Sequence, residues 1–182
     1  MFKYKVMFTI LICTFFSYAH ASDCLINNQK INGVGIGDPA EKIFSTFQSK
    51  YKIVDEKRPH SLRKVILYKE NRLVIQFEIT EDKNKILFIS VYDNCVTNEN
   101  IGIGSMLSDA VKVYGKGSIS PADEGYLIDF AGAKGLSFLL DNGDIPKRLR
   151  NIPDDDFTKK QEKEIMNLKN VKIKSIKISG IY

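Results

Sequence analysis

The chain has three cysteines, of which Cys13 lies in the N-terminal apolar run; Cys24 and Cys95 are the pair whose type and spacing offer the clearest chemistry. In an exported protein, an isolated pair of cysteines most often forms a structural disulfide. A bridge between these two would close a loop of about 70 residues and stabilise the fold by about 4 kcal/mol on the chain-entropy estimate. The alternative is a redox site, which favours a Cys-x-x-Cys spacing that this pair lacks. The spacing therefore favours a structural disulfide.

Carboxylates and His60 are the other groups that could act on a substrate or hold a metal; the second histidine, His20, lies in the N-terminal segment 1–21. His60 lies in a polar loop and cannot form a zinc site without cysteines, which are expected to be bridged. The stretch Asp141-Asn142-Gly143-Asp144 lacks the remaining ligands and the closing glutamate of a calcium loop, so a turn is expected there. A hydrolase would need two acids at a fixed separation across a cleft. The acids that could supply such a pair are Asp93, Asp123, Glu124, Asp129, Asp141, Asp144 and Asp154–Asp156. No metal or cofactor is predicted, and a small acid/base hydrolase remains an alternative function.

The phrase Gly-Ile-Gly occurs twice, at residues 35–37 and 102–104. A dinucleotide-binding loop would need a third glycine three residues later, and a Walker loop would need a lysine in its fixed position. Neither copy has this glycine or this lysine. Glycine also lets a backbone turn sharply and lie close under a helix. We therefore interpret the phrase as a structural turn, with Asp38 and Ser105 as the N-caps of the helices that follow.

Residues 1–21 have the pattern of a secretory signal peptide. Lys3 and Lys5 precede an apolar run over 6–16, and Ala19-His20-Ala21 offers small residues at the −3 and −1 positions of a cleavage site. The alternative, an uncleaved anchor, is weaker because the run is shorter than the ~20 residues that span a bilayer. This pattern predicts a periplasmic or secreted protein with no transmembrane segment after cleavage.

The composition argues against nucleic acid as a partner. The formal net charge of +5 falls to +3 when Lys3 and Lys5 are removed, and the charges are mixed along the chain. A nucleic-acid-binding domain usually concentrates a strong basic patch on one face. The 161 residues from Ser22 to Tyr182 are enough for one domain with a sizeable core.

Each Gly-Ile-Gly stretch leads into a segment of helical periodicity. Apolar residues recur on one face from Ile43 to Tyr51 and from Leu107 to Tyr114. Runs rich in β-branched and aromatic residues follow at 62–68, 72–79, 85–92, 126–130, 135–140 and 171–178. The run 72–79 alternates, which predicts one covered face with Leu73, Ile75, Phe77 and Ile79 and one wet face with Arg72, Val74, Gln76 and Glu78. These patterns predict an α+β fold, with a single domain over 22–182 made of two tandem helix-plus-antiparallel-strand units, about 22–96 and 97–182.

An insertion over 141–170 distinguishes the second unit from the first. Asp154–Asp156 are predicted to head one extra C-terminal helix that runs to about Leu168, before the last strand. The alternation of that strand slips phase, which predicts a β-bulge near Lys174-Ser175. Arg148 and Arg150 precede the three aspartates, and they either neutralise these acids or rim a binding surface.

An aromatic patch on the open face of the sheet is a candidate interface. If Leu87, Ile89 and Val91 face the helices, then Ile86, Phe88 and Tyr92 face the other way, together with Tyr68 or Tyr126. Exposed aromatic patches often mark protein interfaces. The alternative is that the insertion covers this face, and the sequence does not decide between the two. The candidate interface residues are Ile86, Phe88, Tyr92, Tyr126, Arg148 and Arg150.

The order of short motifs along the chain resembles that of a broad group of bacterial envelope proteins, which includes the beta-lactamase inhibitor protein and the small lipoproteins of the outer-membrane assembly machinery. Within this group, the layout is most similar to the RpoE-regulated envelope lipoproteins, whose function is unknown. The stretches that carry the resemblance are NGVGIGDPAEKIF, ILFISVYDNCVTNENIGIGSMLSDAVKVYGKG, GLSFLLD and VKIKSIKI. The resemblance implies a fold like that of the inhibitor protein and brings no catalytic residues.

Taken together, these features predict an exported, non-enzymatic envelope protein that binds an unidentified envelope or secreted protein. An inhibitor or immunity protein against a cell-wall hydrolase is a sharper alternative, which comes from the inhibitor side of the resemblance. The oligomeric state is not predicted.

Overall fold

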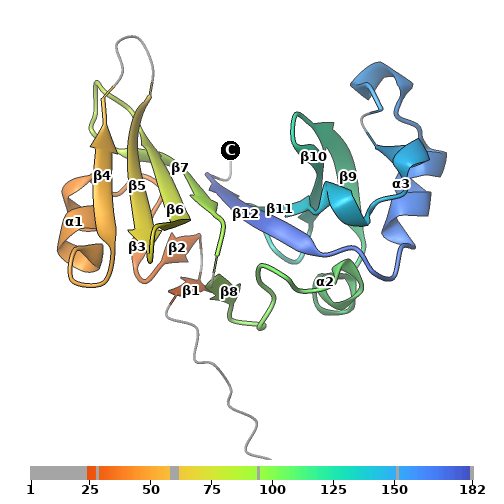
Figure 1. Cartoon of the computed structure of the whole chain (residues 1–182), viewed down its shortest axis with the longest axis horizontal. Helices are drawn as coiled ribbons and strands as arrows, with labels where there is room; N and C mark the ends of the chain where they lie inside the picture. Colours follow the sequence, from red (N-terminus) through yellow and green to blue (C-terminus); the bar gives the residue numbers. More distant parts are fainter. Residues whose placement is uncertain (1–23, 28, 58–61, 94, 151, 181–182) are drawn as a thin grey trace, which may run out of the picture.

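The computed structural model describes residues 24–27, 29–57, 62–93, 95–150 and 152–180. The predicted signal peptide and His60 lie outside these ranges. Over the described residues, twelve strands form two sheets, and three α-helices accompany them (Figure 1). The helices are α1 (Glu41–Phe47), α2 (Leu107–Tyr114) and α3 (Lys159–Met166). The short 3-10 turns are Asn142–Asp144, Lys147–Leu149 and Asp154–Asp156.

The larger sheet has eight antiparallel strands in the order β4-β5-β6-β7-β12-β11-β10-β9. Its first four strands are β4 (Lys52–Glu56), β5 (Arg63–Lys69), β6 (Arg72–Ile79) and β7 (Ile86–Val91). The others are β9 (Gly117–Ala122), β10 (Gly125–Phe130), β11 (Leu136–Leu140) and β12 (Ile173–Ser179). The two runs of four strands meet where β7 pairs with β12, at the centre of the molecule (Figure 1).

A smaller sheet has the order β3-β2-β1-β8. Its strands are β1 (Cys24–Asn27), β2 (Lys30–Ile31), β3 (Val34–Gly35) and β8 (Cys95–Thr97). β1 and β8 come from distant parts of the sequence and pair in parallel, and this pairing joins the chain start to the connection between β7 and α2. Ile26, Ile31 and Val34 of this sheet are buried in the same core as the large sheet.

The predicted fold class is wrong. An α+β protein of two tandem helix-plus-strand units was expected, whereas the described chain is mostly β, with twelve strands against three helices of seven or eight residues. Four strands, β1, β2, β3 and β8, have only two to four residues and belong to a separate sheet that no periodicity indicated. Strand pairing, rather than helix packing, therefore organises the molecule.

α1 and α2 cover one face of the large sheet. Phe47 of α1 packs against Phe77 of β6, with ring centroids 5.9 Å apart. Tyr114 of α2 packs against Phe130 and Phe138, at 5.7 and 5.8 Å. These aromatic contacts fix which side chains of each strand point into the core, because neighbouring residues of a strand point to opposite faces.

The two Gly-Ile-Gly stretches form the same turn. Gly37 and Gly104 have positive φ values, +81° and +85°. The Gly37 amide donates to the Ile86 carbonyl and the Gly104 amide donates to the Ile173 carbonyl, each at 2.8 Å. Because both amides bond to carbonyl groups of the chain, they are not free to cradle a phosphate.

Asp38 and Ser105 close this turn and do not cap the helices, so their prediction as N-caps is wrong. An oxygen of Asp38 accepts the Gly35 amide at 2.9 Å, and the Ser105 hydroxyl accepts the Gly102 amide at 3.0 Å. The N-cap positions of α1 and α2 lie further along the chain and have no side-chain cap. What the repeated phrase encodes is a turn closed by the fourth residue.

The strand predictions are mostly confirmed in position and phase. Ile75, Phe77 and Ile79 of β6 are fully buried on the helix side, as their alternation indicated. The bulge in the last strand is also confirmed, because Leu139 pairs with Ser175 and Leu140 pairs with Ile173. Lys174 lies between these two pairs and is the extra residue.

The insertion differs from its prediction in where the helix begins. A 3-10 turn occupies Asp154–Asp156, and α3 starts after Thr158, which forms a capping box with Gln161. α3 lies against β9, the edge strand of the large sheet, and an oxygen of Glu162 accepts the Ile119 amide at 3.3 Å. The helix thus covers a sheet edge.

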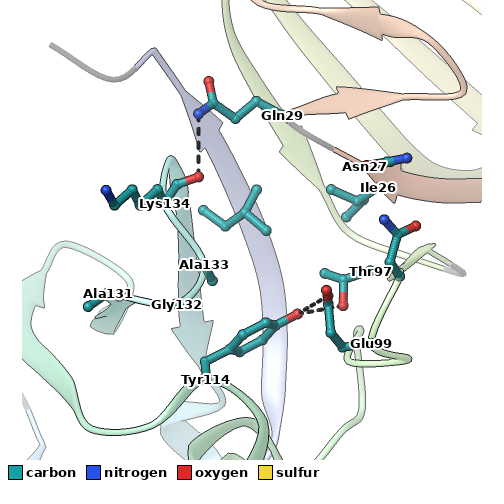
Figure 2. Close-up of a pocket in the computed structure, with 12 residues that line it drawn as sticks. Ile26, Asn27, Gln29, Thr97, Glu99, Tyr114, Ala131, Gly132, Ala133 and Lys134 are labelled. Carbon is teal, nitrogen blue, oxygen red and sulfur yellow. Dashed lines mark hydrogen bonds between the residues drawn. The ribbon is translucent and has the colours of Figure 1, made fainter.

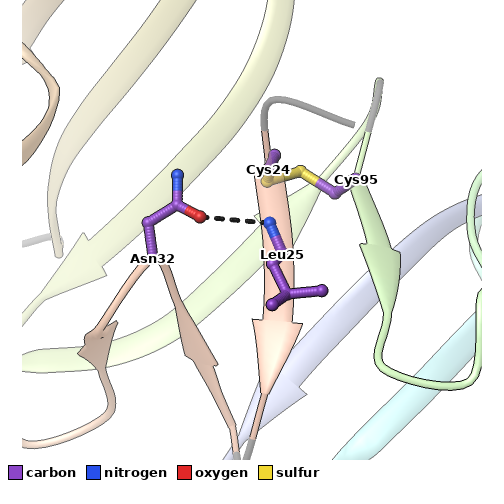
Figure 3. Close-up of a disulfide and its surroundings, with 4 residues drawn as sticks. All are labelled: Cys24, Leu25, Asn32 and Cys95. Atoms are coloured by element: carbon purple, nitrogen blue, oxygen red, sulfur yellow. Dashed lines mark hydrogen bonds between the residues drawn. A yellow bond between two sulfur atoms is a disulfide. The ribbon is translucent and has the colours of Figure 1, made fainter. Parts of the chain in front are cut away.

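The predicted disulfide between Cys24 and Cys95 is present. The two Cα atoms are 4.6 Å apart, and both residues are buried at the start of the parallel β1–β8 pair (Figure 3). Beside the bridge, the Leu25 amide donates to the side-chain oxygen of Asn32 at 3.1 Å. Within the described ranges, no helix is long and apolar enough to cross a membrane.

Candidate functional site

The face of the large sheet opposite the helices is the first candidate surface. On β7, Ile89 is buried on the helix side with Phe77, so Phe88 and Ser90 point to the opposite face. The strand register places short or polar side chains around them. These neighbours are Gln76, Glu78, Ser137, Lys177 and Ser179. We call this surface, from β6 to β11, the open face. No labelled helix lies between the two groups of strands in Figure 1.

Two of the six predicted interface residues are core residues. Ile86 is 2% exposed, because a register shift between Glu78 and Ile79 leaves Leu87 unpaired and turns Ile86 to the helix side. Tyr126 is 1% exposed and shares the phase of Ile128, so it also faces the core. The predicted aromatic patch therefore does not form in the expected composition.

Phe88 and Tyr92 do lie toward the open face. Phe88 is 37% exposed, and Tyr92 is half-buried just beyond the end of β7. Burial raises the pKa of Tyr92, although a hydrogen bond with Ser90 opposes this change. The open face thus presents an accessible aromatic ring among small serines.

Arg148 and Arg150 lie in the insertion, and both have partners within it. Arg148 forms an ion pair with Glu164 of α3, which raises the pKa of the guanidinium and lowers the pKa of Glu164. Arg150 donates to the carbonyls of Ile145 and Gly143, the latter at 2.7 Å. These arginines hold the insertion together, and among the described side chains neither pairs with Asp155 or Asp156.

The insertion covers only one end of the open face. Ile152 and Pro153 line a hollow with Leu139 and Lys177, which lie on the open face of β11 and β12. Leu139 is buried there, whereas Phe88 on β7 remains exposed. The sequence left open whether this face is exposed or covered by the insertion. It is exposed around Phe88 and covered at the end near Leu139.

A polar pocket of about 540 Å³ is the second candidate site (Figure 2). Three segments form its walls, namely β1 with the following turn, the loop 97–99, and the loop 131–134 between β10 and β11. Tyr114, at the end of α2, points between them. The Gln29 amide donates to the Lys134 carbonyl at 3.4 Å and joins two of the walls.

Tyr114, Thr97 and Glu99 form a hydrogen-bonded group in this pocket (Figure 2). The Tyr114 oxygen lies 2.6 Å from the hydroxyl of the buried Thr97, and the phenol donates to Glu99 Oε2 at 2.9 Å. Burial, together with the neighbouring Glu99, raises the pKa of Tyr114 to about 12. Burial tends to raise the pKa of Glu99, but hydrogen bonds from Tyr114 and Thr97 lower it overall. At neutral pH the carboxylate is ionised and the phenol is protonated.

These ionisation states limit the chemistry of the pocket. A general acid or base works best when its pKa lies near the operating pH, and both groups are shifted away from neutrality. Glu99 is the one carboxylate among the pocket's lining residues, so this pocket lacks the paired acids of a glycosidase-like hydrolase. In the described part of the chain, no group of three His, Cys, Asp or Glu residues could hold a metal ion. The arrangement is suited to binding.

Sequence reasoning did not identify this pocket. Glu99 follows Thr97 in a polar turn, and Tyr114 was assigned only to the apolar stripe of its helix. Their proximity depends on the parallel β1–β8 pair and on the loop 131–134. No local sequence pattern predicts the β1–β8 pairing or the position of this loop.

Comparisons with known proteins identify a fold but no family. No family model matches the chain, and no curated protein matches its sequence. The structure is similar to the crystal structure of the uncharacterized protein YfeY from Escherichia coli, with a TM-score of 0.53 and 16% sequence identity. The match covers 80% of this chain and 96% of that chain. At this identity the likeness establishes a shared fold and leaves the function of both proteins open.

Proposed function

We propose that this chain is an exported, non-enzymatic envelope protein of the RpoE-regulated kind, and that it binds another envelope or secreted protein through its open face. The disulfide and the N-terminal sequence pattern support export, since such bridges persist in oxidising compartments. The uncharacterized fold neighbour is compatible with this class.

The exposure of Phe88 is the observation that carries the proposal. A phenylalanine that is 37% exposed lies on a central strand, beside Ser90 and Ser179 and next to the charges of Glu78 and Lys177. Aromatic residues are enriched in protein interfaces, and short serines supply adaptable hydrogen bonds around them. Charges of both signs would fix the orientation of the partner more than they would add affinity.

The test is crosslinking followed by pulldown from native envelopes, with the wild type and two variants. Ser90→Arg places a long charged side chain in the middle of the open face and should remove the crosslinked partner. Val113→Asp is the matched control, because Val113 is 45% exposed on α2, away from the open face, and this variant should retain the partner. Recovery of no specific partner, or equal recovery by both variants, would contradict the proposal.

The inhibitor or immunity alternative is tested with the same material. If the recovered partner is a cell-wall hydrolase, the purified chain should lower its activity at a one-to-one ratio, and Ser90→Arg should not. A partner of another kind, or a hydrolase whose activity does not change, would remove this alternative and leave the binding proposal standing.

A further inference from the structure

The polar pocket described above has the features of a small-molecule site that is separate from the open face. Its volume of about 540 Å³ lies within the range of roughly 300–1,000 Å³ that is usual for ligand sites. It is built on the helix side, from β1, the loop 97–99 and the loop 131–134. A ligand here would not compete directly with a protein on the open face.

The walls of this pocket are held in place by specific contacts. Ile26 pairs with Thr97 in the parallel β1–β8 ladder, two residues after the disulfide. Gly132 lies so close to the end of α2 that an added Cβ would be 2.9 Å from the Tyr114 carbonyl oxygen. A preformed pocket spends less binding free energy on ordering its own groups.

Glu99 and Lys134 are the charged residues in the lining of the pocket, and Glu99 is the acidic one. Its Oε2 atom accepts the phenol of Tyr114, which fixes the carboxylate against the wall. Among the described residues, no lysine, arginine or histidine forms an ion pair with Glu99, and Figure 2 shows the Lys134 ammonium directed away from it. A fixed carboxylate without a cationic partner is an acceptor for a charged donor from a ligand.

The rest of the lining indicates what surrounds that donor. The side-chain amides of Asn27 and Asn98 offer both donors and acceptors, and Ala131, Gly132 and Ala133 leave space opposite them. The ring of Tyr114 adds an aromatic surface beside the carboxylate. We propose that this pocket binds a small ligand, about the size of a monosaccharide or a dipeptide, that places a protonated primary amine on Glu99 and hydroxyl or amide groups on the two asparagines.

The test is an NMR titration of the oxidised chain with two amines and their neutral counterparts. Glucosamine represents an amino sugar and alanyl-alanine amide represents a peptide amino terminus; N-acetylglucosamine and the N-acetylated dipeptide amide lack the charge. We expect one of the amines to shift resonances of Thr97, Tyr114 and residues 131–134, with at least about tenfold higher affinity than its acetylated form, as one charge-assisted hydrogen bond implies. The amine that binds more tightly identifies the source of the ligand.

Variants separate the role of the carboxylate from general effects. Glu99→Gln should weaken binding of the preferred amine about tenfold or more, whereas Glu81→Gln, at an exposed turn lining a different pocket, should not. Ala131→Leu, at an exposed position in the far wall, should also reduce binding by filling space without touching Glu99. The spectra show directly whether each variant is folded. Binding of neither amine up to tens of millimolar, equal binding of the acetylated forms, or shifts outside the pocket would overturn the proposal.

Discussion

Breaking the Cys24–Cys95 bridge should cost this protein a large part of its stability. The two cysteines are separated by 71 residues, and the chain-entropy relation converts a loop of this length into about 4 kcal/mol at 25 °C. The loss should fall on the native state as a whole, because β1 is joined to β8 by only three residue pairs and lies in the common core. For a chain of this size, a loss of about 4 kcal/mol corresponds to a fall in Tm of about 8–16 °C.

Urea unfolding followed by circular dichroism measures this loss. Comparison of oxidised and reduced wild type isolates the cross-link, since the side chains are the same, and Cys24→Ala/Cys95→Ala adds the packing change at two buried positions. We expect the midpoint to fall strongly on reduction and slightly more in the double variant. A loss below about 1 kcal/mol would show that the entropy argument fails here, and free thiols in the native, non-reduced protein would show that the bridge is absent.

Three further predictions test the turn, the insertion and the polar pocket. Gly104→Ala should lower the free energy of unfolding by about 1–2 kcal/mol, because residue 104 has a positive φ. Gly102→Ala should lower it more, by about 3 kcal/mol, because the added Cβ would lie 2.3 Å from the Cys95 carbonyl oxygen. The reverse order in urea unfolding would refute this account of the turn. Tyr126→Phe keeps the ring contact with Phe157 but removes the hydrogen bond from the Tyr126 hydroxyl to the buried Leu149 carbonyl. Chemical denaturation should therefore show a loss of about 1–2 kcal/mol in the free energy of unfolding. An unchanged free energy would mean that this hydrogen bond is not formed. Because the pKa of Glu99 is lowered on folding, Glu99 stabilises the fold at pH values above its unfolded pKa of 4.5, and this contribution is lost as the pH falls through the lower folded pKa. Because the pKa of Tyr114 is raised on folding, Tyr114 stabilises the fold below pH 10, and this contribution is lost as the pH rises toward about 12. Glu99→Gln should flatten the acid limb of a stability–pH profile and Tyr114→Phe the alkaline limb, and unchanged limbs would contradict these ionisation states.

The sequence was informative wherever a single segment determined the outcome. The alternation of β6 placed Ile75, Phe77 and Ile79 correctly, because a half-buried strand must show period two. The phase slip of the last strand correctly indicated the bulge at Lys174. The disulfide was predicted from an isolated cysteine pair in a chain that begins with a secretory signal pattern, and the bridge is present.

Features that depend on pairing between segments could not be predicted. Ile86 was assigned to the open face because the shift that leaves Leu87 unpaired arises from its register with β6. The strands of the small sheet have two to four residues, too few for a periodic signal, and β4 and β9 of the large sheet were not predicted either. The β content was therefore underestimated and the fold class was wrong. Aspartate is a residue type that is common at N-caps, but the Asp38 carboxylate accepts a hydrogen bond from the Gly35 amide, three residues earlier. The polar pocket was missed for the same reason, since Glu99 and the loop 131–134 meet only in the folded chain.

The contact between Glu162 and the Ile119 amide has a consequence for self-association. The large sheet has two edge strands, β9 and β4. α3 lies against β9, whereas β4 has a backbone edge with no further strand of this sheet paired to it. Because only the β4 edge of this sheet is available, the sheet can add one more copy there, β4 against β4, and the two edges then block each other. Lys52, Asp55 and Glu56 on β4 oppose even that step. Extension of this sheet beyond such a dimer would require α3 to detach from β9, so this short helix protects that edge against further strand addition.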